Sequence, residues 1–264
     1  MNFYELEISK VESNTKNAVL VEFEIPSHLK EKFQFLSGQN IVLDFIIERN
    51  NYRRTYSICS SPYENKLCIS VKRQAKGIIS NYINDAFFRG LKVRVSEPMG
   101  DFYDNEQIID SSNVILWAGG SGITVMLSLA KYILEVFSHK KLLLIYANKN
   151  QQSIMFEDEI EGLRTQYKER FLVTQILSNS TVSEGFFAKL FSLNVSKKPW
   201  NGLTGYITKE FVDKIATKFP NSVHYICGPE KMMEICETTL LDKGTKNVYL
   251  ERSEERRVGK ECSS

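Results

Sequence analysis

Over roughly the first hundred residues, apolar and polar positions alternate in short stretches bounded by turn-forming residues. Alternation with a period of two is typical of strands that bury one face. It predicts strands at residues 4–11, 18–24, 40–47, 55–60, 67–73 and 92–96. Only residues 80–88 have a helical pattern, and Asn50-Asn51 is among the predicted turns. Several short strands at this spacing favour a small antiparallel β-barrel or sandwich.

After residue 110 the pattern changes to short apolar runs separated by helical patterns. The runs predict strands at residues 114–117, 141–146, 171–177 and 222–226, with helices at 123–137, 155–167, 209–217 and 230–241. Strand and helix in alternation indicate an α/β domain whose parallel sheet has helices on both faces. Residues 181–203 follow no period, so we expect a loop that holds at most one short helix.

A chain of 264 residues is longer than a typical single-core domain, which favours two domains. Its 34 basic and 32 acidic residues give a net charge of +2, and the basic residues are scattered along the chain. That distribution argues against a nucleic-acid surface. The amino terminus lacks the basic start and apolar run of a secretory signal, and no stretch is apolar and long enough to span a bilayer. We therefore expect a soluble, cytoplasmic protein.

The cysteines and histidines do not have the close spacings of a zinc site or an iron-sulfur loop. The five cysteines are Cys59, Cys68, Cys227, Cys236 and Cys262, and the three histidines are His28, His139 and His224. We expect reduced thiols, ordinary histidines and no metal site in this chain.

The stretch from Val114 to Val136 has the order strand, glycine-rich turn and helix, with Ala118-Gly119-Gly120-Ser121-Gly122 as the turn. Such a turn lets the backbone approach a bound phosphate, while the unpaired N–H groups of the first helical turn face the anion. It has two glycines of the dinucleotide fingerprint, and Val125 stands where the third would fall. A strand-to-helix turn that merely needs positive φ is the alternative, and this stretch alone does not decide between them.

A second candidate site is Arg53-Arg54-Thr55-Tyr56-Ser57. In a strand, Arg54 and Tyr56 share one face while Thr55 and Ser57 share the other. A cation beside an aromatic ring suits a phosphate next to a flat heterocycle. On the residues alone, a surface cation–π pair is the simpler interpretation.

Five motifs in order resemble those of the ferredoxin-NADP reductase family, and the similarity extends over nearly all of residues 1–251. Arg54-Thr55-Tyr56-Ser57 is similar to the Arg-x-Tyr-Ser flavin motif of that family. The others are Val71-Lys72-Arg73 with Gly77-Ile78-Ile79-Ser80, Pro98-Met99-Gly100-Asp101-Phe102, Gly119-Gly120-Ser121-Gly122-Ile123-Thr124 and Cys227-Gly228-Pro229. Five ordered matches are more specific than any single one.

The resemblance implies an FAD site on the amino-terminal domain. By that similarity Arg54 binds the FAD pyrophosphate, Tyr56 stacks on the isoalloxazine, and Ser57 donates a hydrogen bond near flavin N5. The same resemblance assigns a second segment to the pyrophosphate, through backbone N–H groups and the Ser80 hydroxyl. Its residues are Val71, Lys72, Arg73, Gly77, Ile78, Ile79 and Ser80.

The resemblance also implies a nicotinamide nucleotide on the carboxyl-terminal domain. The diphosphate loop would consist of Gly119, Gly120, Ser121, Gly122, Ile123 and Thr124, and Cys227-Gly228-Pro229 would lie on the nicotinamide side. Cys227 would sit beside nicotinamide C4, so that Tyr56, Ser57 and Cys227 line the reacting rings. Positioning of two flat rings supplies most of the catalysis, and no general base is needed. A buried structural thiol at Cys227 and helix-start punctuation at Gly228-Pro229 are the alternatives.

The choice between NADPH and NADH rests on the end of the second strand of the α/β domain. An acidic residue there would accept from the ribose 2'-hydroxyl of NADH. Instead Tyr146 is followed by Ala147-Asn148-Lys149-Asn150, which suits a 2'-phosphate. Against this, Ser178-Asn179 stands where NADPH-selective relatives often have Ser-Arg. We expect NADP with NAD as the alternative.

We divide the chain into an FAD-binding β-barrel domain at residues 1–107, an NAD(P)-binding α/β domain at 108–251 and a tail at 252–264. Within the family the similarity is fullest to reductase components of oxygenases such as phenylacetyl-CoA epoxidase, which continue into a plant-type ferredoxin domain. The tail resembles translated sequencing adapter more than protein, so we expect a non-native or disordered segment that replaces the ferredoxin domain. A solvated charged tail is the alternative.

The resemblance thus implies an FAD-dependent NAD(P)H oxidoreductase that passes electrons to an iron-sulfur acceptor, either its own missing domain or a separate ferredoxin. It would feed an oxygenase or epoxidase of aromatic degradation, with no nucleic-acid or membrane partner. One alternative is a free-standing ferredoxin or flavodoxin reductase. Another is a nucleotide-binding module that senses redox state without turnover.

Overall fold

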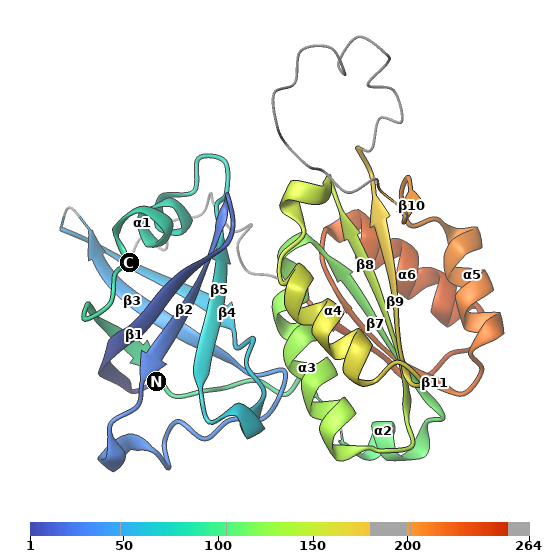
Figure 1. Ribbon diagram of the computed structural model, residues 1–264, viewed down its shortest axis with the longest axis horizontal. Coiled ribbons are helices and arrows are strands. Elements are labelled where there is room, and N and C mark those ends of the chain that lie inside the picture. Colours follow the sequence, from blue (N-terminus) through green and yellow to red (C-terminus); the bar gives the residue numbers. More distant parts are fainter. Residues whose placement is uncertain (48, 104, 180–199, 201, 253–264) are drawn as a thin grey trace, which may run out of the picture.

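The computed structural model describes residues 1–47, 49–103, 105–179, 200 and 202–252 of the chain. The described residues form two six-stranded sheets, one antiparallel and one parallel, and each has a hydrophobic core of its own. In Figure 1 the antiparallel sheet is on the left and the parallel sheet with its helices is on the right. The prediction of a β-barrel followed by an α/β domain is confirmed.

The amino-terminal sheet has the order β4-β3-β6-β1-β2-β5. Its elements are β1 (Phe3–Thr15), β2 (Ala18–Glu24), β3 (Asn40–Ile47), β4 (Asn50–Ser57), β5 (Leu67–Lys72), β6 (Lys92–Ser96), α1 (Ile78–Ala86), η1 (Ser27–Leu29) and η2 (Pro62–Glu64). Beyond the end of β4, Ile58 bridges Ile69, and Cys59 N donates to Cys68 O at 2.8 Å. These contacts bring the two ends of the sheet together into a barrel.

Strand β4 corrects one sequence prediction, because it begins at Asn50 and not at residue 55. Asn50 and Asn51 belong to the strand and pair with Ile47 and Ile46 of β3. Asparagine is disfavoured in strands, and the pairing with a neighbouring strand overrides that local preference.

The second sheet has the order β10-β9-β8-β7-β11-β12, and every neighbouring pair is parallel. Its strands are β7 (Asn113–Gly119), β8 (Lys141–Asn148), β9 (Phe171–Leu177), β10 (Leu203–Thr204), β11 (Ser222–Cys227) and β12 (Val248–Glu251). The other elements are α2 (Asn105–Asp110), η3 (Gly120–Gly122), α3 (Ile123–Val136), η4 (Gln151–Ser153), α4 (Glu157–Gln166), α5 (Lys209–Lys218) and α6 (Glu230–Asp242). Figure 1 shows α3 and α4 on the face toward the barrel and α5 and α6 on the other.

Both faces of this sheet are buried, which explains its nearly continuous apolar strands. Leu116 and Leu144 belong to the core that contains α3, whereas Ile115 and Ile145 belong to the core that contains α6. Successive residues of one strand therefore enter different cores. The strands β10 and β12 and the helix α2 were not predicted, because each is too short to establish a period.

Helix α3 lies between the barrel and the parallel sheet (Figure 1). Three small barrel residues, Ala18, Cys59 and Cys68, belong to the same buried cluster as the apolar side chains of α3. The barrel and the sheet domain therefore share a packed interface. Within the described ranges, no helix combines the length and the apolar character needed to cross a bilayer.

Two sequence expectations fall on parts that lie outside the described residues. They are most of the 181–203 loop and all but the first residue of the 252–264 tail.

Candidate functional site

The two glycine motifs of the α/β domain pack against each other at the carboxyl ends of β7 and β11. A Cβ on Gly122 would lie 2.2 Å from Cys227 O, and a Cβ on Gly119 would lie 2.4 Å from Pro229 Cδ. A Cβ on Gly228 would lie 2.9 Å from Gly119 N. These three glycines are therefore required by the close approach of two backbones, whatever they bind.

Gly120 differs from them, because a Cβ there would meet only Lys72 Nζ, at 3.9 Å. Its φ of +55° also favours glycine. Lys72 comes from β5 of the barrel, so a barrel cation lies beside the glycine loop of the other domain. The resemblance assigned Lys72 to the FAD pyrophosphate, and in the structure its ammonium lies near the loop expected to hold the second nucleotide.

The amino terminus of α3 follows that loop directly. Gly122 is the residue that precedes the helix and offers no side-chain cap. Thr124 Oγ1 donates to Ser121 O at 3.0 Å, which fixes the turn, and Tyr146 Oη donates to Gly120 O at 3.3 Å. An uncapped helix start with positive dipole character suits an anion such as a diphosphate.

Strand β12 brings the two domains' candidate residues together. Glu251, its last residue, is the direct neighbour of Cys227 in the parallel register. The same Glu251 accepts a hydrogen bond from Ser57 Oγ of the barrel at 3.1 Å through Oε1. Ser57 and Cys227, predicted from separate motifs, are therefore both neighbours of Glu251.

The Glu251 carboxyl has an unusual environment. Burial raises its pKa to about 7, and the hydrogen bond from Ser57 opposes that rise. Its Oε2 is buried and has no hydrogen-bond partner within the described part of the chain. A carboxyl with a pKa near 7 can hold or release a proton at neutral pH. Sequence reasoning missed this residue, because no motif includes it and only sheet pairing places it here.

Tyr56 and Arg54 point to the same side of β4, as the alternation predicted. Tyr56 pairs with Ile41 and Arg54 with Leu43 in the strand register. Tyr56 belongs to the barrel core and is 6% exposed, so most of its ring is covered by protein. Arg54 Nη1 donates to the carbonyl of Arg53 at 2.7 Å.

The segment expected to hold the flavin pyrophosphate forms a tight turn before α1. Gly77 precedes the helix and provides no side-chain cap, and a Cβ there would lie 2.5 Å from Ser80 Oγ. Ser80 is buried, and its hydroxyl accepts a hydrogen bond from Gln74 N at 3.1 Å. Ile79 is buried while Ile78 is exposed. The hydroxyl therefore holds the turn, and the backbone N–H groups of Ile78 and its neighbours are the groups suited to an anion.

Val71 and Arg73 flank Lys72 with different roles. Val71 is buried in the barrel core, and its carbonyl accepts from Asn84 Nδ2 of α1 at 3.0 Å. Arg73 pairs with Asp85 of α1 at 2.5 Å. Both residues thus hold α1 against the end of β5.

The residues present fit two nucleotide cofactors. Each domain has a helix that starts without a side-chain cap beside a glycine turn, and Lys72 lies near the turn that leads to α3. The orphaned Glu251 Oε2 is suited to a hydrogen-bond donor of a bound group. No cluster of three or more His, Cys, Asp or Glu suited to a metal occurs among the residues that the structure describes.

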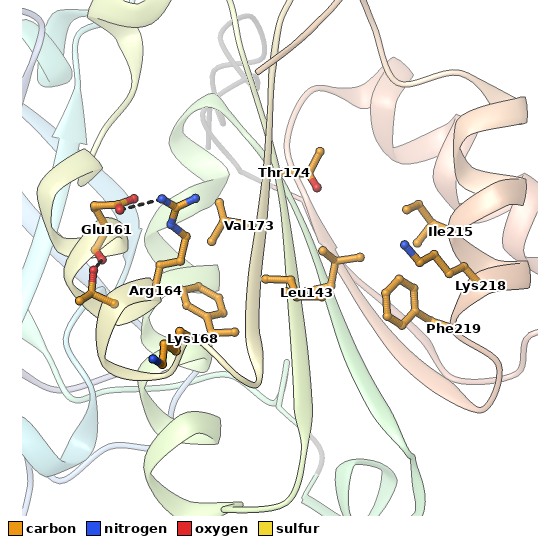
Figure 2. A pocket seen from close by; sticks show the side chains of 12 residues that line it. Leu143, Glu161, Arg164, Lys168, Val173, Thr174, Ile215, Lys218 and Phe219 are labelled. Carbon is orange, nitrogen blue, oxygen red and sulfur yellow. Dashed lines mark hydrogen bonds and ion pairs between the residues drawn. The ribbon is translucent and has the colours of Figure 1, made fainter. Parts of the chain in front are cut away.

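A separate groove of about 640 Å³ lies across the first four residues of β9, between α4 and α5 (Figure 2). Figure 2 shows Arg164 and Lys168 from the α4 side on one wall and Lys218 and Phe219 at the α5 end on the other. In parallel α/β sheets, nucleotides bind at the carboxyl ends of the strands. The groove includes the amino-terminal residue of β9, Phe171, and none of the glycine motif residues. We therefore do not assign the nucleotide to it.

Two known families match successive parts of the chain. Residues 5–103 match the oxidoreductase FAD-binding domain family, and residues 116–238 match the oxidoreductase NAD-binding domain family.

Two curated relatives cover most of the chain. A component of 1,2-phenylacetyl-CoA epoxidase from Escherichia coli is 30% identical over 256 residues, which are 95% of this chain and 67% of that protein. The ferredoxin reductase component of 3-ketosteroid-9-alpha-monooxygenase from Mycolicibacterium smegmatis is 28% identical over 93% of this chain and 64% of its own length. The chain thus spans about two thirds of the length of these two relatives.

Solved structures share the fold. A ferredoxin NADP+ reductase from Neisseria gonorrhoeae with bound FAD and NADP superposes with a TM-score of 0.76 at 19% identity, over 96% of this chain and 99% of that one. Phthalate dioxygenase reductase gives a TM-score of 0.68 at 22% identity, over 95% of this chain and 68% of that one. At these identities the likeness concerns the fold alone.

Proposed function

Because this chain belongs to the ferredoxin-NADP reductase family and is a flavin-dependent NAD(P)H oxidoreductase, we propose that it passes electrons from NADPH through FAD to an iron-sulfur acceptor. The observation that carries the proposal is the Ser57–Glu251 hydrogen bond, with Cys227 beside Glu251. It joins the flavin motif of one domain to the nicotinamide motif of the other.

Bound FAD would supply the conversion from a two-electron donor to a one-electron acceptor. On the flavin side, Arg54 and the N–H groups of the first turn of α1 bind the pyrophosphate, and Tyr56 and Ser57 orient the ring system. Tyr56 packs in the barrel core, which fixes its position.

On the nicotinamide side, Gly120 and the first turn of α3 bind the diphosphate, and Lys72 reaches the same anion from the barrel. Cys227 has a small side chain that packs near Gly122, with Sγ 3.1 Å from the position of a Gly122 Cβ. A small side chain at that point leaves room for a flat ring. Glu251, whose pKa burial raises to about 7, accepts the hydrogen bond from the Ser57 hydroxyl and orients it.

The preference for NADPH rests on the end of β8 and the residues that follow it. Within Ala147-Asn148-Lys149-Asn150 there is no carboxylate to accept from a ribose hydroxyl, and Lys149 is exposed. An exposed ammonium suits a 2'-phosphate. We therefore expect NADPH to be used in preference to NADH.

The acceptor is inferred from the relatives' names, which include an epoxidase and the reductase component of a monooxygenase. We propose that this protein feeds an oxygenase of aromatic degradation through an iron-sulfur centre in the cytoplasm. We further propose that residues 1–107 and 108–251 act as its FAD-binding and NAD(P)-binding domains.

The test is anaerobic spectroscopy of the purified chain. We expect a flavin spectrum with a peak that bleaches when NADPH is added, more slowly with NADH, and that returns when a plant-type [2Fe-2S] ferredoxin is supplied. A protein that takes up no FAD contradicts the flavin site. Bleaching without ferredoxin reduction contradicts the iron-sulfur acceptor alone.

The flavin site itself is tested by a pair of neighbouring substitutions. Arg54→Ala should lower flavin retention, because it removes the proposed pyrophosphate cation. Arg53→Ala is the matched control, since Arg53 pairs with Asp44 at 3.3 Å and its side chain is 57% exposed. Equal flavin retention in the two variants would remove Arg54 from the site.

A further inference from the structure

The strand that carries the flavin motif continues into a segment that contacts α3. After β4 ends at Ser57, residues 60–64 pass along the helix that follows the glycine loop. Ser128 Oγ of α3 donates to Ser60 O at 2.7 Å. Ser37 Oγ of the barrel donates to Ser128 O at 3.2 Å. Ser37, Ser60 and Ser128 are all buried, so these hydrogen bonds form out of water.

One turn along α3, Lys131 makes a three-way contact. Its Nζ lies 3.1 Å from both carboxylate oxygens of Glu64, which is a barrel residue. It also lies 2.5 Å from Glu159 Oε1 at the start of α4. The Lys131 side chain is 13% exposed, so the ammonium is largely withdrawn from solvent.

The charge of Lys131 is stable in this position. Burial lowers its pKa, and the carboxylates of Glu159 and Glu64 raise it by more, so that its pKa lies above the ordinary lysine value. Paired with two carboxylates, the ammonium neutralises a contact that would otherwise bring two negative charges together.

An aromatic contact adjoins the ion pairs. The Tyr63 ring of the barrel stacks on Tyr132 of α3, with ring centroids 5.8 Å apart and an interplanar angle of 18°. The Tyr103 ring packs edge-on against the Tyr132 ring, with ring centroids 5.1 Å apart. Such pairs add specificity of orientation to the contact.

We propose that Lys131 is a positioning residue, which fixes the flavin strand β4 relative to the glycine loop by clamping the 60–64 segment and α4 onto helix α3. The covalent path between the clamp and each site is short. Ser57 is seven residues before Glu64, and Gly122 is nine residues before Lys131. A shift of α3 against the 60–64 segment therefore changes the distance between the two cofactor sites.

This inference rests on the proposed function, since it concerns the step in which two electrons and a proton pass from the nicotinamide to the flavin. That step depends steeply on the separation of the two rings, and a displacement of about 1 Å can cost about a hundredfold in rate. Neither cofactor is held by Lys131 itself. Loss of the clamp should lower the rate of transfer and leave the affinity for each cofactor largely unchanged.

The experiment compares Lys131→Met with wild type in the FAD-loaded protein. Stopped-flow bleaching of the flavin by NADPH is followed under anaerobic conditions as a function of NADPH concentration. We expect the limiting rate to fall about tenfold to a hundredfold while the half-saturating concentration changes less than about threefold. NADPH deuterated at C4 should give an isotope effect at least as large as in wild type, because transfer then limits the rate.

Two variants separate positioning from general stability. Lys131→Arg keeps the positive charge, and a guanidinium can pair with both carboxylates, so it should recover most of the rate. Lys243→Met is the matched control, because it removes an ion pair of 2.6 Å with Asp213 between α5 and α6, away from the barrel. It should leave the limiting rate unchanged. Reoxidation of dithionite-reduced flavin by ferricyanide should be equal in all variants, since it involves no nicotinamide.

A limiting rate in Lys131→Met equal to that of wild type overturns the inference. So does a loss that Lys131→Arg shares. If Lys131→Met fails to retain FAD, Glu64→Gln decides, since it weakens the ion pair between the barrel segment and α3 without emptying the contact; an unchanged rate there overturns the inference. Wild-type flavin that neither nicotinamide bleaches contradicts the proposed function instead, so the two failures are distinct.

Discussion

The Glu251 carboxyl gives a prediction about stability that depends on pH. Burial raises its pKa from 4.5 to about 7 in the folded protein. Between these values the folded state binds a proton that the unfolded state has lost, so its contribution to stability is full below about pH 4.5 and is lost as pH rises through about 7. The rise corresponds to roughly 3 kcal/mol, and we expect about 2 kcal/mol because part of the residue meets solvent.

Glu251→Gln isolates this contribution. The amide cannot ionise, and its oxygen can still accept the hydrogen bond from Ser57. The free energy of unfolding of the variant minus that of wild type should therefore increase by about 2 kcal/mol between pH 5 and pH 8.5, because only wild type loses stability over that range. The variant must be compared with wild type at each pH, because other groups also change stability with pH. Burial lowers the pKa of His224 to about 4, so that histidine makes the stability rise with pH over part of the same range.

The assay is guanidinium unfolding of the flavin-free protein at several pH values, followed by far-UV circular dichroism. Glu169→Gln is the control, because Glu169 is an exposed carboxylate on the turn between α4 and β9. It should give a difference that stays constant over the range. Parallel plots of the free energy of unfolding against pH for wild type and Glu251→Gln would refute the reasoning, since they would mean that the fold does not favour the protonated carboxyl.

Two further substitutions test the packing of the site domain. Gly122→Ala should destabilise the fold by about 3 kcal/mol in the same unfolding assay, because its Cβ would lie 2.2 Å from Cys227 O. The control is Gly162→Ala, whose Cβ would meet nothing within 4 Å and which should be neutral or slightly stabilising. Equal effects of the two substitutions would contradict the backbone contact. Lys140→Met should cost about 3 kcal/mol at neutral pH, because the buried ammonium donates to the carbonyls of Ile109 and Ser111 at the end of α2. The neighbouring Lys141→Met, at an exposed position, should cost little, and a loss as large as that of Lys140→Met would argue against the carbonyl contacts.

Elements with a long, unbroken period could be predicted from the sequence. The bounds of β2, β3 and β6 agree with the alternation, those of β9 agree with its apolar run, and α3 begins at the predicted residue. The period arises from burial of one face, which is a property of consecutive residues. The predicted start of β4 was wrong, because the first residues of this strand are polar and become strand only by pairing with β3.

The glycine positions illustrate a mixed outcome. The sequence indicated a tight turn at residues 119–122, with phosphate binding and positive φ as the alternatives. In the structure only Gly120 of this turn has positive φ, while Gly119 and Gly122 are required by contact with the 227–229 segment. No local pattern could reveal that contact, because its two sides are more than a hundred residues apart. The roles assigned to Arg54, Tyr56 and Ser57 stay predictions.

The sequence by itself determined the strands and helices that have a clear period, and it determined the order of five motifs that identify the family. The tertiary structure alone decided that Glu251 stands between Ser57 and Cys227, that Lys72 of the barrel lies beside Gly120, and that Lys131 joins the barrel to α4. The physical reason is the range of the interactions. Periodicity is set by neighbours along the chain, whereas the ionisation of a carboxyl and the docking of two domains depend on groups that only folding brings within a few ångströms.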